Sequence, residues 1–223
     1  MLEKIEDIKN ASHLLIVTDN KSFANASALY TYALTLHKKV SLQTSNEIET
    51  KYSFLPWYDK VRKVTTSNAD LVINVGENTF DLYGYFRSEN VKINTKLATS
   101  LYCGLLNEFS NFTSKKCNGT VFAYASELIA LNAEHKLCRE YMLNKTALST
   151  LRLKAILFKS LHLKKEATLA EVYVCDEDFK SSGSCLQVAV EIMHEVIQLV
   201  HVKEVILIKT DENSKIIHKL KDI

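Results

Sequence analysis

The sequence is poor in turn-forming residues and has no long apolar run. It contains 5 glycines and 1 proline among 223 residues, which favours helices joined by short polar loops over an all-β sandwich. Apolar stretches such as residues 13–17 are far shorter than the roughly 20 residues that a membrane helix needs, and the N-terminus lacks a signal-peptide pattern. We therefore expect no membrane association and a cytoplasmic location.

The chain also lacks an excess of charge of either sign. Its 28 basic and 26 acidic residues leave a formal net charge of +2, which excludes a strongly basic nucleic-acid binder by composition alone. Basic residues are nevertheless concentrated in residues 136–165, where Glu140 is the one acid. They are Lys136, Arg139, Lys145, Arg152, Lys154, Lys159, Lys164 and Lys165. Such a segment either faces a polyanion or forms a solvated helix face, and the solvated face is favoured.

Motifs for metal and phosphate chemistry are mostly missing. The 5 cysteines include no CxxC pair, so neither a zinc site nor a disulfide framework is expected, and mostly buried, reduced thiols are. The sequence contains no phosphate-binding loop of the GxxxxGK[ST] or GxGxxG type. His194 and His201 lie seven residues apart, but two histidines alone seldom bind metal tightly. The aromatic cluster at residues 83–86 is interpreted as core in preference to a base-stacking surface.

The periodicity of apolar residues predicts strands and helices in alternation in the first third. Strands are expected at residues 13–17, 39–42, 71–75 and 91–93, and helices at residues 2–8 and 23–36. The continuous apolar run at residues 13–17 predicts a strand that is covered on both faces of the sheet. A strand–helix–strand order with crossovers of this length indicates a parallel sheet.

The remaining two thirds are predicted to be helical and then mixed. Helices are expected at residues 97–109, 121–131, 133–143, 148–161 and 186–200, and strands at 167–175, 205–208 and 215–220, the last two as a hairpin. Residues 164–166 are polar and predict a linker. We accordingly expect an α/β domain at 1–145, a connector helix at 146–163 and a small α+β domain at 164–223.

The order of these elements resembles the DHH phosphoesterases, the RecJ-like group that includes oligoribonucleases and 3′-phosphoadenosine-5′-phosphate phosphatases. The resemblance rests on residues 18–36, 52–56, 70–76, 97–106 and 148–153. The final third is similar to the start of the DHHA1 domain. The resemblance implies a DHH-like parallel sheet flanked by helices and a shortened, DHHA1-like second domain.

In that family two divalent metals, usually manganese, are held by carboxylates and histidines, activate water and stabilise the leaving oxygen. Its first motif is a His, an Asp four residues later and an Asp two further on, with a small residue and a Ser behind. Matching Ser27 to that Ser places Val17, Lys21 and Phe23 at the ligand positions. None of these three side chains binds a hard cation, and Asp19 reaches a ligand position only if the register is shifted.

The other motifs depart as well. The second motif is a strand that ends in Asp, whereas here Gly76 follows the strand. The Asp-His-His of the third has no counterpart, because no His-His pair occurs and no histidine lies between His37 and His135. In the fourth, a Gly-x-x-x-Asp segment, Glu108 is the one carboxylate in a matching place after Gly104. The Gly-Gly-x-x-His turn of the DHHA1 domain is also absent from the sequence.

The first hypothesis is therefore a degenerate phosphoesterase-like protein, a pseudoenzyme without bound manganese that works by binding. Its partner would be another protein, a second copy of itself, or a nucleotide or phosphate in a cleft between the domains. Candidate cleft residues are Lys21, Glu108, Arg152 and Lys154. Two alternatives stay open: an active metal-dependent phosphoesterase with a rebuilt site, and a nucleic-acid binding module that uses the basic segment.

Overall fold

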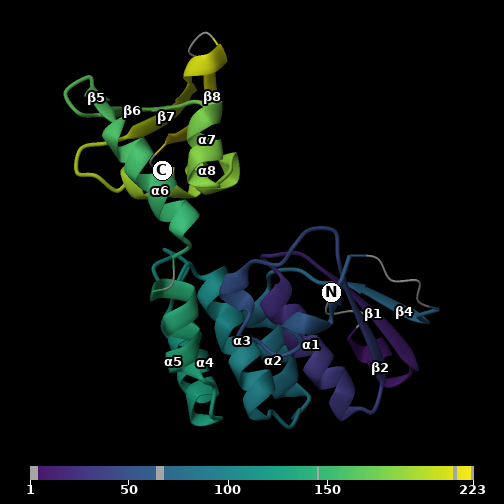
Figure 1. The fold of residues 1–223 in the computed structure, drawn as a ribbon. Coiled ribbons are helices and arrows are strands. Elements are labelled where there is room, and N and C mark those ends of the chain that lie inside the picture. Colours follow the sequence, from purple (N-terminus) through teal and green to yellow (C-terminus); the bar gives the residue numbers. More distant parts are fainter. Residues whose placement is uncertain (1–4, 64–67, 145, 213–214, 222–223) are drawn as a thin grey trace. The chain divides into compact units, whose positions relative to one another are not determined.

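The computed structural model describes residues 5–63, 68–144, 146–212 and 215–221. The chain divides into two compact units, residues 1–145 and 146–223 (Figure 1). Each unit has its own hydrophobic core and is described by itself.

The first unit is built on a parallel four-stranded sheet with the strand order β3-β2-β1-β4. Its strands are β1 (His13–Thr18), β2 (Lys39–Thr44), β3 (Val61–Arg62) and β4 (Leu71–Asn74). Strand β1 pairs in parallel with both β2 and β4, Ile16 lying beside Leu42 on one side and Ile73 on the other. The expected parallel α/β sheet is therefore confirmed.

One face of this sheet is more deeply buried than the other. In β1, Leu14, Ile16 and Thr18 are buried, whereas His13, Leu15 and Val17 are only half-buried. On the same face as Leu15, Val72 of β4 is 40% exposed. The prediction that residues 13–17 are covered on both faces was wrong, because an apolar run alone does not distinguish a central strand from one with a partly open face.

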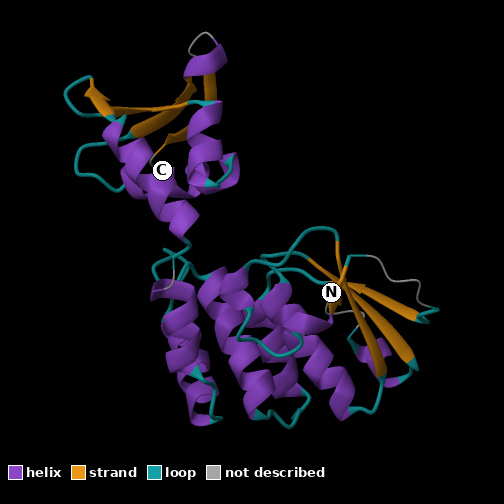
Figure 2. Ribbon diagram, in the orientation of Figure 1, coloured by secondary structure: helices purple, strands orange, loops and turns teal. Residues whose placement is uncertain are grey.

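Helices form the remainder of the first unit and lie to one side of the sheet (Figure 2). They are α1 (Phe23–Thr35), α2 (Thr79–Ser88), α3 (Thr95–Glu108), α4 (Gly119–Ala130) and α5 (His135–Arg139), with a π-helical turn at Glu140–Asn144. Single-turn 3₁₀ helices occur at Glu6–Lys9, Thr50–Tyr52 and Tyr58–Lys60. Helix α1 packs on β1 and β2, and α3 packs on α1, α2, α4 and α5. The predicted helix at residues 2–8 is represented by Glu6–Lys9, since residues 1–4 lie outside the described part.

The segment around residue 90 differs from its prediction. Residues 91–93, predicted as a strand, have no regular structure. Asn90 has a left-handed backbone (φ 51°) and the Val91 N–H donates to the Phe86 carbonyl at 2.9 Å. This is the hydrogen-bond pattern that ends a helix. The backbone of Val91 therefore completes the C-terminus of α2, a helix that the sequence reading missed.

The second unit contains a mixed sheet with the strand order β5-β6-β7-β8. Its strands are β5 (His162–Lys164), β6 (Leu169–Val174), β7 (Glu204–Lys209) and β8 (Lys215–Lys221), and its helices are α6 (Leu148–Lys159), α7 (Asp176–Ser182) and α8 (Leu186–Val196), with a 3₁₀ turn at Thr210–Glu212. Strands β6 and β7 are parallel, and β7 and β8 form the expected antiparallel hairpin. Helix α6 supplies Leu153 and Leu157 to the core of this unit.

The polar stretch at residues 164–166 is part of a hairpin, not a linker. Lys164 ends β5, which pairs antiparallel with β6, and Lys165 and Glu166 turn the chain with φ values of 50° and 54°. Turn residues and linker residues have the same polar composition, so composition alone did not separate them.

All five cysteines are free, with Cys103 and Cys138 buried, Cys117 and Cys175 half-buried and Cys185 exposed. The prediction of mostly buried thiols is therefore right for two of them only. Among the described residues, no helix is long and apolar enough to cross a membrane.

Candidate functional site

The carboxyl ends of β1, β2 and β4 meet at one edge of the first sheet. Thr18 lies beside Thr44, and Val17 beside Asn74, in the parallel registers. Open α/β sheets bind ligands at this edge because the loops that leave parallel strands converge there. We call the residues at this edge and on the adjoining ends of α1, α2 and α3 the carboxyl-edge site.

The loop between β1 and α1 is closed by its own hydrogen bonds. The Asp19 carboxylate accepts from the Ser22 N–H at 2.9 Å and from the Ser22 hydroxyl at 2.6 Å, and Ser22 is 3.0 Å from the Thr18 hydroxyl. Burial pushes the pKa of Asp19 up, but the hydrogen bonds from Ser22 and the charge of Lys21 outweigh it, so the pKa is lowered. This acid therefore holds the start of α1 in place.

A buried aromatic cluster lies at the start of α1. The Phe23 side chain is fully buried, with its ring centroid 5.8 Å from that of Tyr52 and 6.0 Å from that of Tyr58. The Tyr52 hydroxyl accepts a 2.9 Å hydrogen bond from Asn107 of α3. Burial raises the pKa of Tyr52, so its hydroxyl stays neutral. Phe23 thus contributes apolar packing at a position where the DHH resemblance requires a metal-binding carboxylate.

A buried polar contact joins α1 to the start of α2. The Thr79 hydroxyl donates to Asn25 Oδ1 at 2.7 Å, and Asn25 Nδ2 donates to the Gly76 carbonyl at 2.8 Å. Gly104 of α3 faces this pair, and a Cβ atom there would meet Thr79 Oγ1, with Thr79 Cγ2 at 2.7 Å and Asn25 Oδ1 at 2.8 Å. Only glycine lets α3 approach so closely.

Glu108 at the end of α3 caps α2. Its carboxylate accepts a 2.8 Å hydrogen bond from the Phe80 N–H. The N-cap residue Asn78 makes no side-chain cap hydrogen bond, so Glu108 satisfies an amide group that Asn78 leaves without a partner. Burial raises the pKa of Glu108 despite its hydrogen bonding to the backbone.

The residues that the DHH resemblance places at ligand positions do not fit a two-metal centre. Val17 is half-buried, Lys21 is exposed, Phe23 is packed among aromatic rings, and Gly76 has no side chain. Within the described ranges, no group of three or more His, Cys, Asp or Glu side chains is placed to hold a metal ion. Manganese needs several such donors in one place.

The four candidate cleft residues fall in different units. Lys21 and Glu108 belong to the first unit, while Arg152 and Lys154 belong to the second. Within the second unit Lys154 forms an ion pair with Glu195 and lies 5.4 Å from the Phe158 ring centroid. The cleft between the units stays a prediction.

The basic segment is divided between the two units. Lys136 and Arg139 belong to α5 of the first unit, Arg152, Lys154 and Lys159 to α6, and Lys164 to β5. Of the aromatic residues in α2, Tyr83 and Phe86 are buried and Tyr85 is half-buried against the same core, as the core interpretation predicted.

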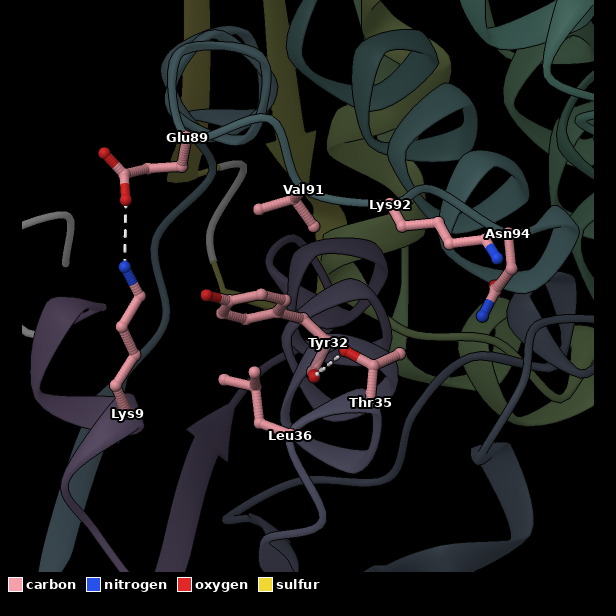
Figure 3. A pocket seen from close by; sticks show the side chains of 8 residues that line it. All are labelled: Lys9, Tyr32, Thr35, Leu36, Glu89, Val91, Lys92 and Asn94. Atoms are coloured by element: carbon pink, nitrogen blue, oxygen red, sulfur yellow. Dashed lines mark hydrogen bonds and ion pairs between the residues drawn. The ribbon is translucent and has the colours of Figure 1, made fainter.

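A separate cavity of about 610 Å³ lies away from the carboxyl edge. Figure 3 shows Tyr32 in its middle, the Lys9–Glu89 ion pair on one side, and Lys92 and Asn94 on the other. The Lys9 and Glu89 side chains are 2.9 Å apart and neutralise each other. Lys92 adds a further positive charge, so the lining of this cavity has a net charge of +1.

Several residues of the carboxyl-edge site were not found from the sequence. The Asn25–Thr79 pair joins residues 54 positions apart, and only the fold brings them together. Gly104 in the middle of an apolar helix was the available signal, because a helix-interior glycine often marks a close approach.

The comparison with solved structures supports the fold. An exopolyphosphatase-related protein from Bacteroides fragilis superposes with a TM-score of 0.76 at 12% identity, covering 97% of this chain and 82% of that protein. A Methanococcus jannaschii protein, named as a candidate family II inorganic pyrophosphatase, is 12% identical, and the match covers 88% of this chain and 83% of that protein. Its TM-score of 0.34 is too low to carry an argument. No protein-family description and no curated protein sequence matches the chain. The DHH-like α/β fold is thus confirmed as a fold.

Proposed function

We propose that this chain belongs to the DHH phosphoesterase superfamily, has lost two-metal hydrolysis, and acts by binding. The observation that carries the proposal is Phe23, a fully buried ring that packs against Tyr52 and Tyr58 at a metal-ligand position of the family. A carboxylate there would have to displace an aromatic cluster. The residue that replaces the metal ligand is therefore part of the hydrophobic core.

The acids that remain nearby have other tasks. Asp19 is hydrogen-bonded by Ser22, and Glu108 by the backbone of α2. Two-metal hydrolysis relies on the ions to activate water and to stabilise the leaving oxygen. One capping glutamate replaces neither role, so a rebuilt active site is the weaker reading.

The chemical class of the binding partner is proposed, and its identity is not. A second copy of this chain, another protein, or a nucleotide or phosphate that contacts Lys21 all stay compatible with the carboxyl-edge site. The nucleic-acid alternative is weaker, because Lys154 is paired with Glu195 and the net charge of the chain is only +2.

The test combines metal analysis with an activity assay. We expect no stoichiometric manganese, magnesium or zinc after gel filtration. We also expect no manganese-stimulated hydrolysis of short oligonucleotides or of 3′-phosphoadenosine-5′-phosphate. Glu108→Gln keeps a hydrogen-bond acceptor for α2, and Glu6→Ala serves as an exposed control. One or two metals per chain, or turnover that Glu108→Gln abolishes and Glu6→Ala preserves, would refute the proposal.

A further inference from the structure

A second cavity in the first unit, of about 680 Å³, lies on the other side of α3 from the carboxyl-edge site. Tyr102 and Leu106 of α3 line it. Tyr102 precedes Gly104 by two residues, and Leu106 precedes Glu108 by two. Two residues turn a helix by about 200°, so the members of each pair lie on opposite faces of α3. The loop after α3 and the segment from α5 to Leu143 form the other walls. This volume is in the usual range for a small-molecule site.

One wall of this cavity is aromatic. Phe112 lies between Tyr102 and Phe122, with ring-centroid distances of 6.1 Å and 5.6 Å, and Phe122 is 52% exposed. The backbone of Phe112 is left-handed (φ 64°), as are those of Ser110 and Asn111 before it. This conformation is costly for a bulky side chain, and such residues concentrate at ligand sites. The loop therefore holds the Phe112 ring at the cavity at an energetic cost.

The opposite wall is basic. Lys136 and Arg139 are three residues apart on α5, which places them on one face of the helix. Neither forms an ion pair with any residue that the structure describes. Glu140 also lines the cavity, so its lining has a net charge of +1 with His135 neutral. An anion that enters meets two available cations.

We propose that this cavity binds a nucleoside monophosphate. The base stacks on the aromatic wall at Phe112, because every base presents a flat face to an aromatic ring. The phosphate contacts Arg139 and Lys136, since a guanidinium binds phosphate through two parallel hydrogen bonds. The inference does not depend on the loss of hydrolysis proposed above, because the cavity lies on a different face of α3.

Isothermal titration calorimetry of the full chain tests this directly, with AMP, adenosine and inorganic phosphate as separate ligands. We expect saturable 1:1 binding of AMP that weakens as salt is added. Adenosine lacks the phosphate and inorganic phosphate lacks the ring. Each is therefore expected to bind at least tenfold more weakly than AMP, which is the effect expected from losing one hydrogen bond to a charged group. Phosphate that binds as tightly as AMP overturns the proposal in favour of a simple anion site.

Three variants locate the binding. Arg139→Ala and Phe112→Leu are expected to weaken AMP binding about tenfold each, with circular dichroism confirming that they fold. Arg62→Ala removes the same charge from an exposed position of β3 in the first unit, outside the cavity lining, and serves as the matched control. If Phe112→Leu does not fold, Lys136→Ala replaces it with the same expectation. Absence of saturable AMP binding at millimolar concentration overturns the proposal, as does an equal loss in Arg139→Ala and Arg62→Ala.

Discussion

Glu108 shows how a carboxylate at an expected ligand position can be a structural residue. It accepts the Phe80 N–H at 2.8 Å and is partly buried, so its pKa is raised by burial. A raised carboxyl pKa means that the folded protein favours the neutral form. The stability that this group contributes is therefore present below the ordinary glutamate value of 4.5 and is lost as pH rises through the higher folded value.

This predicts opposite behaviour for two substitutions of Glu108. Glu108→Gln keeps the acceptor and removes the charge, so its stability at neutral pH should equal or exceed that of the wild type. Glu108→Ala leaves the Phe80 N–H without its partner and should cost about 1 kcal/mol. Urea denaturation from pH 4.5 to neutrality measures both. A Glu108→Gln protein as unstable as Glu108→Ala would show that the charge itself is needed.

At the scale of elements, the packing of α3 depends on one glycine. Gly104 faces Thr79 and Asn25, and a Cβ atom would lie 2.7 Å from Thr79 Cγ2 and 2.8 Å from Asn25 Oδ1. Alanine normally favours a helix over glycine by up to about 1 kcal/mol. Here overpacking should reverse the sign, because α3 must move away from the Asn25–Thr79 hydrogen bond.

We therefore expect Gly104→Ala to destabilise the protein by about 1–3 kcal/mol. Gly84→Ala, in the interior of α2, is the matched control, since its Cβ would meet only the Tyr124 hydroxyl at 3.6 Å. That variant should be neutral or slightly stabilising. Thermal melts of both variants provide the measurement, and equal melting temperatures for the two would contradict the assigned contact.

The sequence predicted elements well where one apolar face repeats. Strand β1, helix α1 and the β7–β8 hairpin were expected, because their apolar residues follow a clear period. Helix α2 was not predicted, although Phe86 follows Leu82 by four residues and Tyr83 by three. The Asn25–Thr79 pair and the Glu108 cap depend on tertiary contacts, which periodicity does not contain.

At the scale of the whole molecule, the two hydrophobic cores have no residue in common. The first is centred on residues such as Leu29 and Ile73, and the second on Leu157 and Leu207. Each core belongs to one of the two compact units. A loss of packing in one core should therefore leave the stability of the other unit unchanged, as for well-separated sites.

The single tryptophan makes this independence measurable. Trp57 belongs to the first unit, where it stacks on Tyr30 with ring centroids 4.8 Å apart. Leu157→Ala should destabilise the second unit by about 2–5 kcal/mol and shift part of the circular dichroism transition in urea, while the Trp57 fluorescence midpoint stays in place. Leu29→Ala is the matched variant of the first core and should move the Trp57 midpoint. If Leu157→Ala lowers the fluorescence midpoint as much as Leu29→Ala does, the chain unfolds as one cooperative unit, since a cavity in one core then weakens both.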